Sequence, residues 1–185
     1  MKQKLDQHIL SHNYVKVYIT DKESAHITHF AGIVFDQTDD LVLMSDTNDF
    51  DYDGLIVLRK NDISEIKHTD NERFVTHILE QEGLRENWLE RRAAMNISLA
   101  PLQQLLEQVQ ALGLPIIAEC RYKGDDIFQV GPIHSVTEEH LKIQYFNANG
   151  EYDLKPTLAE LDAITFLRID SPYANLMFKY AAKAE

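Results

Sequence analysis

The sequence contains a single cysteine, Cys120, among 185 residues, so an intramolecular disulfide is excluded. This cysteine lies in the apolar segment 115–120, away from any pair of basic residues, and we expect a buried and inert thiol. No apolar run approaches the roughly 20 residues that a membrane-spanning helix needs. The first ten residues are too polar for a signal peptide. We therefore expect a cytoplasmic protein that does not span a membrane.

Positive charge is also scarce. The chain has 18 Lys and Arg against 30 Asp and Glu, which gives a formal net charge of −12 at pH 7. A field of this sign repels phosphate backbones and disfavours sequence-independent binding of nucleic acid. The basic residues that stand close together are Arg59-Lys60, Arg85, Arg91 and Arg92, and we interpret them as parts of solvated surfaces.

Motifs of enzymatic chemistry are absent from the sequence as well. It has no nucleophile elbow, phosphate-binding loop or glycine-rich dinucleotide fingerprint. The paired acids Asp39-Asp40 and Glu138-Glu139 fall in expected turns, where we predict contact with solvent and no pocket. We therefore expect a protein that is not an enzyme and that carries no cofactor.

What the sequence does contain is a repeat of itself. Aligned at a shift of 100 residues without a gap, residues 1–85 fall on 101–185 with the apolar positions in register. The identical pairs include Ile33 with Ile133, Tyr52 with Tyr152, Asp53 with Asp153 and Asp70 with Asp170. We therefore predict two copies of one domain, residues 1–83 and 98–185, joined by a linker helix over 84–97.

Each copy is predicted to begin and end with a helix and to hold short strands between them. The clearest helix opens the second copy, with Ser98 as N-cap, Pro101 in its first turn and Gly113 after its end. Alternating apolar residues predict strands over 14–20, 27–35, 41–45, 55–59 and 63–67, and over 116–122, 127–136, 141–146 and 164–169. Asp70 and Asp170-Ser171 are expected to cap the closing helices.

A glycine in the long second strand, Gly32 or Gly131, marks the place where a small barrel must bend. Residues 32–36 with 41–43, and then residues 56–66 with the basic pair Arg59-Lys60, resemble the Sm-like fold. The latter stretch is similar to the second Sm motif of the bacterial Sm-like RNA chaperone. The resemblance implies an α+β, mainly β, protein of two tandem five-stranded Sm-like or SH3-like barrels, each flanked by short helices.

RNA binding is the function that this resemblance would imply, but two departures stand against it. The asparagine that stacks on an RNA base in Sm proteins is replaced by Asp40, and the second copy lacks the basic pair. An RNA-binding regulator therefore remains an alternative hypothesis that the net charge opposes.

Two groups of residues could bind a metal ion. Asp49, Asp51 and Asp53 have the spacing of a calcium loop, although Lys60 stands where a closing glutamate is expected. We interpret this stretch as a solvated hairpin loop, with a weak cation site as the alternative. His8 with His12, and His26 with His29, are spaced closely enough to consider zinc, but an interaction of the first pair with the end of its helix is the simpler explanation.

The candidate ligand-binding residues are Tyr52, Asp53, Arg59, Lys60, Trp88, Tyr152 and Asp153. The repeated Tyr-Asp pairs favour a shared structural role. Trp88, the one tryptophan, lies in the linker helix and is expected to pack between the copies or to anchor a partner.

Three hypotheses of function remain open. The first is a non-enzymatic binding or scaffold module that holds a protein or small ligand, with homo-oligomers formed through uncovered barrel edges. The second is the RNA-binding regulator. The third is an enzyme or metal-dependent protein whose site no motif reveals.

Overall fold

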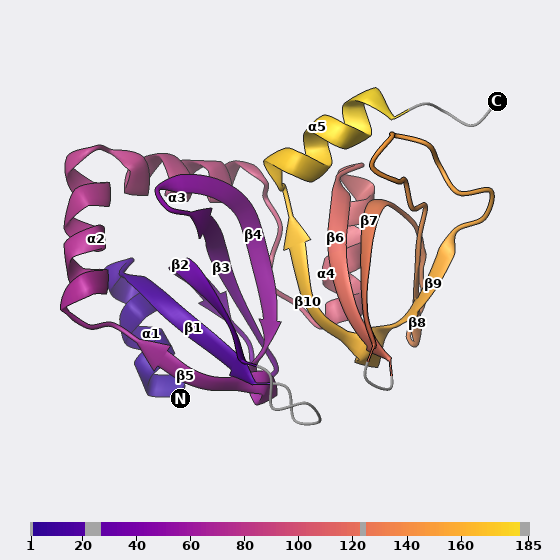
Figure 1. Cartoon of the computed structure of the whole chain (residues 1–185). Helices are drawn as coiled ribbons and strands as arrows, with labels where there is room; N and C mark the ends of the chain where they lie inside the picture. Colours follow the sequence, from indigo (N-terminus) through magenta and orange to yellow (C-terminus); the bar gives the residue numbers. More distant parts are fainter. Residues whose placement is uncertain (1, 21–26, 123–124, 182–185) are drawn as a thin grey trace. The chain divides into compact units, whose positions relative to one another are not determined.

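The computed structural model describes residues 2–20, 27–122 and 125–181, and the side chains of 121–127 are not described (Figure 1). The chain divides into two compact units, Met1–Leu99 and Ala100–Glu185. Both combine helices with a larger share of strands, which confirms an α+β, mainly β, fold class. No helix in the described ranges has the length and apolar character needed to cross a membrane.

The first unit is one antiparallel sheet with three helices. Its strands follow the order β5-β1-β2-β3-β4. The elements are α1 (Lys2–Ser11), β1 (Tyr14–Thr20), β2 (Ile27–Gln37), β3 (Leu41–Asn48), β4 (Asp51–Arg59), the 3₁₀ turn η1 (Lys60–Asp62), β5 (Ile63–Lys67), α2 (Asp70–Gln81) and α3 (Leu84–Ala94).

The second unit repeats this order of strands, β10-β6-β7-β8-β9, and has one closing helix where the first unit has two. Its elements are α4 (Leu102–Ala111), β6 (Pro115–Tyr122), β7 (Asp125–Val136), β8 (His140–Ile143), β9 (Thr157–Glu160), the 3₁₀ turn η2 (Leu161–Ala163), β10 (Ile164–Ile169) and α5 (Pro172–Tyr180). The sequence did not predict β9, which is only four residues long. Closure of either sheet into a barrel, and the boundaries 1–83, 84–97 and 98–185, remain predictions.

The glycine of the long second strand is required by the close approach of a neighbouring strand. A Cβ atom on Gly32 would lie 2.1 Å from the carbonyl oxygen of Ser45, and one on Gly131 would lie 2.1 Å from that of Gln144. Just beyond each glycine the pairing with the next strand shifts register, between Val34 and Asp36 and at the matching place in β7. The strand therefore bends where only glycine fits.

The single shift of 100 residues is wrong at several positions. Gly32 corresponds to Gly131, 99 residues later, whereas the pair Tyr18–Glu65 corresponds to Glu119–Phe166, 101 residues later. Counted between matching paired positions, the second unit has two residues fewer from its first strand to its second, and two residues more from its third strand to its fourth. Surface connections tolerate such changes. The offset between the units is therefore 101 residues in the first strand, 99 in the second and third, and 101 again in the fourth and fifth, so the ungapped shift of 100 lies one residue from each.

Of the expected helix caps, Ser171 is confirmed as the N-cap of α5, whereas the other positions differ from the prediction. The N-cap of α2 is Thr69, whose amide and hydroxyl donate to the Glu72 carboxylate at 2.7 and 2.6 Å, so Asp70 is the first helical residue. Asp170 precedes the N-cap of α5 and therefore does not correspond to Asp70. Helix α4 begins after Pro101, and Ser98 does not cap it.

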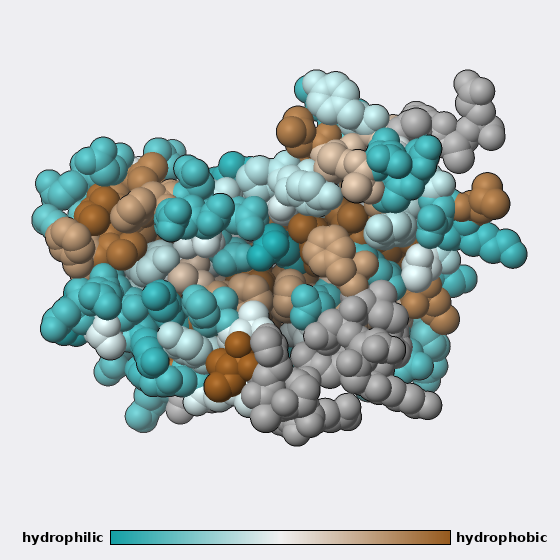
Figure 2. All heavy atoms as spheres, viewed as in Figure 1, coloured by the Kyte–Doolittle hydropathy of each residue, from teal (hydrophilic) through white to brown (hydrophobic). Residues whose placement is uncertain are grey.

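The core of each unit lies between its sheet and its helices. In the first unit, Tyr14, Ile33, Leu79 and Trp88 form one buried cluster. In the second, Ile117, Val130, Phe146 and Ala174 form another. On the face shown in Figure 2 polar residues predominate, and apolar residues reach the surface over α2, the helix that carries the exposed Phe74. Single exposed apolar side chains of this kind are normal in folded proteins.

Candidate functional site

Trp88 is part of the core of the first unit. Its side chain is 4% exposed, and its ring centroid lies 6.3 Å from that of Tyr52. The Arg91 guanidinium lies over the Tyr52 ring, 4.4 Å from the ring centroid. The described contacts of Trp88 are thus with its own unit, whereas the sequence predicts packing between the copies or against a partner. A side chain so deeply buried offers little surface to a partner.

Tyr152 occupies a comparable place in the second unit. It meets Phe146 edge to face, with ring centroids 5.9 Å apart, and burial raises the pKa of its hydroxyl. Asp153 contributes main-chain bonds, since its amide donates to Tyr145 at 3.0 Å and its carbonyl accepts from Gln144 at 2.7 Å. These contacts favour the structural role of the repeated Tyr-Asp pairs. Asp53 is half-buried in β4.

The acidic stretch Asp49, Asp51 and Asp53 forms a tight hairpin between β3 and β4. Asp49 adopts a left-handed conformation with φ of 54°, and Asp51 pairs with Asn48 across the turn. Within the described residues, no three His, Cys, Asp or Glu side chains are grouped so that they could hold a metal ion. His26 lies outside those residues. A cation site at this hairpin therefore remains a prediction.

Lys60 of the basic pair is turned inward. It is 9% exposed, its amide donates to the Asp40 carbonyl at 2.8 Å, and its ammonium donates to the carbonyl of Thr38. The ammonium thus stabilises the β2–β3 turn of the first unit. Arg59, at the end of β4, is half-buried. This geometry disfavours recognition of a phosphate by Arg59 and Lys60 together, because the Lys60 ammonium is turned inward.

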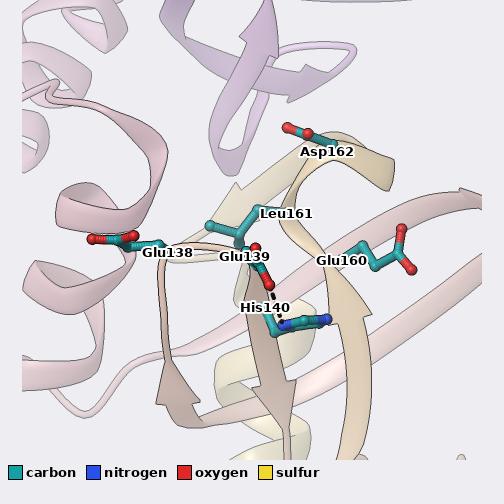
Figure 3. Close-up of a pocket in the computed structure, with 6 residues that line it drawn as sticks. All are labelled: Glu138, Glu139, His140, Glu160, Leu161 and Asp162. Carbon is teal, nitrogen blue, oxygen red and sulfur yellow. Dashed lines mark ion pairs between the residues drawn. The ribbon is translucent and has the colours of Figure 1, made fainter.

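A pocket of about 320 Å³ lies in the second unit, where the β7–β8 turn meets the end of β9 (Figure 3). Four of its six lining residues are acids and none is lysine or arginine. The lining residues are Glu138, Glu139, His140, Glu160, Leu161 and Asp162. Glu138 and Glu139 are exposed to solvent, as expected, but the expectation that no pocket lies there is wrong, because the register of β8 with β9 brings a second acidic turn beside them.

One hydrogen bond of the main chain closes the β7–β8 turn, and a second joins this turn to η2. The Thr137 amide donates to the His140 carbonyl at 2.8 Å, and the Leu161 amide donates to the Glu139 carbonyl at 2.8 Å. The His140 ring is 3.9 Å from the Glu139 carboxylate, so the two would form an ion pair if the ring were protonated. In Figure 3 the carboxylates of Glu138, Glu160 and Asp162 point away from one another. The walls of the pocket thus carry negative charge, but the carboxylates do not converge on one point.

The corresponding place in the first unit holds two basic residues. The bond from Leu161 to Glu139 matches the bond from Lys60 to Asp40, and the turns η1 and η2 begin at Lys60 and Leu161. Leu161 therefore occupies the position of Lys60, and Glu160 that of Arg59. The sequence showed that the second copy lacks the basic pair, but only the strand register shows that a pocket lies there.

No protein-family model matches the chain, and a search of curated proteins finds no match. The function must therefore be inferred from the geometry of the two units.

Proposed function

We propose that the protein is a non-enzymatic binding module whose second unit receives a cationic side chain, lysine or arginine, of a partner protein. The observation that carries this proposal is the replacement of Arg59 and Lys60 by Glu160 and Leu161 at matching positions. In the first unit a lysine ammonium of the chain itself reaches the turn. In the second unit the corresponding residue is apolar, and the pocket is open to a basic group from another molecule.

The chemistry of the lining fits such a group. Lysine and arginine combine an apolar stem with a charged end. Leu161 offers an apolar contact for the stem, and the carboxylates of Glu138, Glu139, Glu160 and Asp162 attract the charge. A volume of about 320 Å³ is at the lower end of the range of roughly 300–1,000 Å³ found for ligand pockets, so it suits one side chain better than a large cofactor.

The net charge of −12 supports the same class of partner. A strongly acidic protein attracts basic surfaces over long distances and increases the rate at which they meet. It also repels nucleic acid, which argues against the RNA-binding alternative. We infer a cytoplasmic location and the Sm-like origin of both units on the grounds given by the sequence, with the shared order of strands as additional support. Assembly of several copies through barrel edges belongs to the same proposal.

Amide chemical shifts in solution test the proposed pocket directly. The probe is a short capped peptide with one lysine, and the matched control is the same peptide with acetyl-lysine, which lacks the charge. We expect the lysine peptide to shift the amides of His140, Leu161 and Asp162, and the acetylated peptide to leave them in place. Shifts of equal size with both peptides, or shifts confined to other acidic surfaces, would contradict the proposal.

A charge-matched variant separates the pocket from the general field of the protein. Glu160→Arg introduces the residue of the first unit at the pocket, and Glu107→Arg makes the same change of charge on an exposed position of α4. We expect the first to weaken binding of the lysine peptide at least about tenfold, and the second to weaken it less than about twofold at roughly 150 mM salt, where distant charges are screened.

A further inference from the structure

Two histidines pack against each other where α1 meets the rest of the first unit. His8, on α1, is 6% exposed, and its ring centroid lies 5.1 Å from that of His68, between β5 and α2. The Nδ1 atom of His68 is 3.0 Å from the Tyr14 carbonyl oxygen. A carbonyl only accepts, so this nitrogen carries the proton of the neutral ring.

The surroundings of His8 oppose a second proton. Its Nδ1 atom lies 3.4 Å from the side-chain nitrogen of Asn13, which donates to the neutral ring. Its Nε2 atom is buried and has no hydrogen-bond partner among the residues that the structure describes. Protonation would place a hydrogen on Nδ1, facing the donor of Asn13, and would bury a charged ring.

Burial and the neighbouring basic side chains also disfavour the protonated form of His8. Burial, then His68, then Lys4 lower the pKa of His8 below its usual value. Lys4 lies one turn away on α1 and donates to the Ile66 carbonyl.

The carboxylates on neighbouring elements are held by other groups. Asp39 of the β2–β3 turn accepts from Lys2 at 3.1 Å, Asp6 of α1 accepts from Gln37 of β2, Glu72 of α2 accepts from Thr69, and Glu65 of β5 lies 3.5 Å from Lys67. His12 follows the end of α1.

We propose that His8, packed against His68, is a proton-sensitive latch that holds α1 against the first unit at neutral pH and releases it in mildly acidic solution. The His8 ring can stay buried against His68 and Asn13 as long as it is neutral. When α1 leaves, His8 becomes solvated and can take up a proton freely. Leu5, a fully buried residue of α1 itself, becomes exposed at the same time. The latch is independent of the pocket in the second unit.

The direction of the pH effect follows from proton linkage. Since folding lowers the pKa of His8, its neutral form stabilises the docked helix above the unfolded pKa of about 6.5, and this contribution is lost as the pH falls below that value. For one histidine that binds no proton when docked, the equilibrium for release of α1 rises up to about tenfold between about pH 7.5 and pH 5.5.

Hydrogen exchange of the full chain at a series of pH values measures this release. After correction for the intrinsic pH dependence of exchange, we expect the protection of α1 amides to fall about five- to tenfold between roughly pH 7.5 and pH 5.5, while β1 and β3 keep theirs. A fall of less than about twofold in α1, or an equal fall in β1 and β3, would overturn the latch.

Variants identify the titrating groups. His8→Phe keeps an aromatic ring without a titratable nitrogen, and His8→Gln is a second variant in case the larger ring disturbs packing. Either is expected to make protection of α1 independent of pH. His77→Gln on the exposed face of α2 is the control and should leave the pH dependence unchanged. A pH dependence that persists in both His8 variants would contradict the assignment.

Discussion

Replacing Gly32 with alanine tests the packing of the bent strand in the first unit. The new methyl group would lie 2.1 Å from the carbonyl oxygen and 2.6 Å from the hydroxyl oxygen of Ser45. The carbonyl belongs to the backbone of β3 and cannot rotate away, so β2 and β3 must separate. The separation also disturbs the hydrogen bond of 2.8 Å that the Ile33 amide donates to the Ser45 hydroxyl.

The cost can be estimated from these two effects. Overpacking a well-packed core destabilises by about 1–3 kcal/mol, and loss of a buried hydrogen bond adds roughly 1 kcal/mol. We expect Gly32→Ala to lower the free energy of unfolding by about 2–4 kcal/mol. Urea denaturation followed by Trp88 fluorescence is a suitable assay, because Trp88 and Ile33 belong to the same buried cluster.

Gly83 provides the matched control. It has φ of 67°, and among the residues that the structure describes no atom lies within 4 Å of the place that a Cβ would take. Gly83→Ala therefore meets only the backbone cost of a left-handed conformation, about 1 kcal/mol. A Gly32→Ala protein that is as stable as Gly83→Ala, with an unchanged denaturant slope, would refute the close approach of the two strands.

Three further predictions concern single residues. Tyr52→Ala should lower the free energy of unfolding by about 1–3 kcal/mol because it removes the ring packed between Trp88 and Arg91, and an unchanged melting temperature would count against that packing. Cys120 should react slowly with a thiol reagent at pH 8 until the protein unfolds, since burial raises the pKa of its thiol to about 11; fast reaction in the folded state would contradict its burial. Uridine-rich and adenine-rich RNA should show no sub-micromolar binding by fluorescence anisotropy, because Lys60 is turned inward and the net charge is −12.

Local patterns predicted most of the secondary structure. Alternation of apolar residues located β1 and β10 with the observed bounds, Tyr14–Thr20 and Ile164–Ile169. The motif Thr69-x-x-Glu72 is a capping box that could have been recognised in the sequence, but Asp70 drew attention to the wrong residue. Strand β9 escaped prediction because four residues, Thr157–Glu160, are too few to show a clear alternation.

The pocket could not be predicted in the same way. Glu138-Glu139 and Glu160 are separated in sequence, and each alone has the pattern of a solvated turn. Only the pairing of His140 with Glu160 brings the two turns together, and that register depends on connections whose lengths differ between the units. An ungapped shift of 100 residues also places Glu160 on Lys60, whereas the structure places Leu161 there.

The central claim is that the second unit binds a basic side chain where the first unit holds its own. Calorimetric titration of a capped lysine peptide into the wild-type protein and into the double variant Glu160→Arg with Leu161→Lys tests it most directly. The double variant restores the residues of the first unit, and its lysine can reach the turn at Thr137 as Lys60 reaches Thr38. We predict that the wild type binds the peptide and that the double variant loses at least about tenfold in affinity, or about 1.4 kcal/mol. Equal affinity in the two proteins would contradict the account.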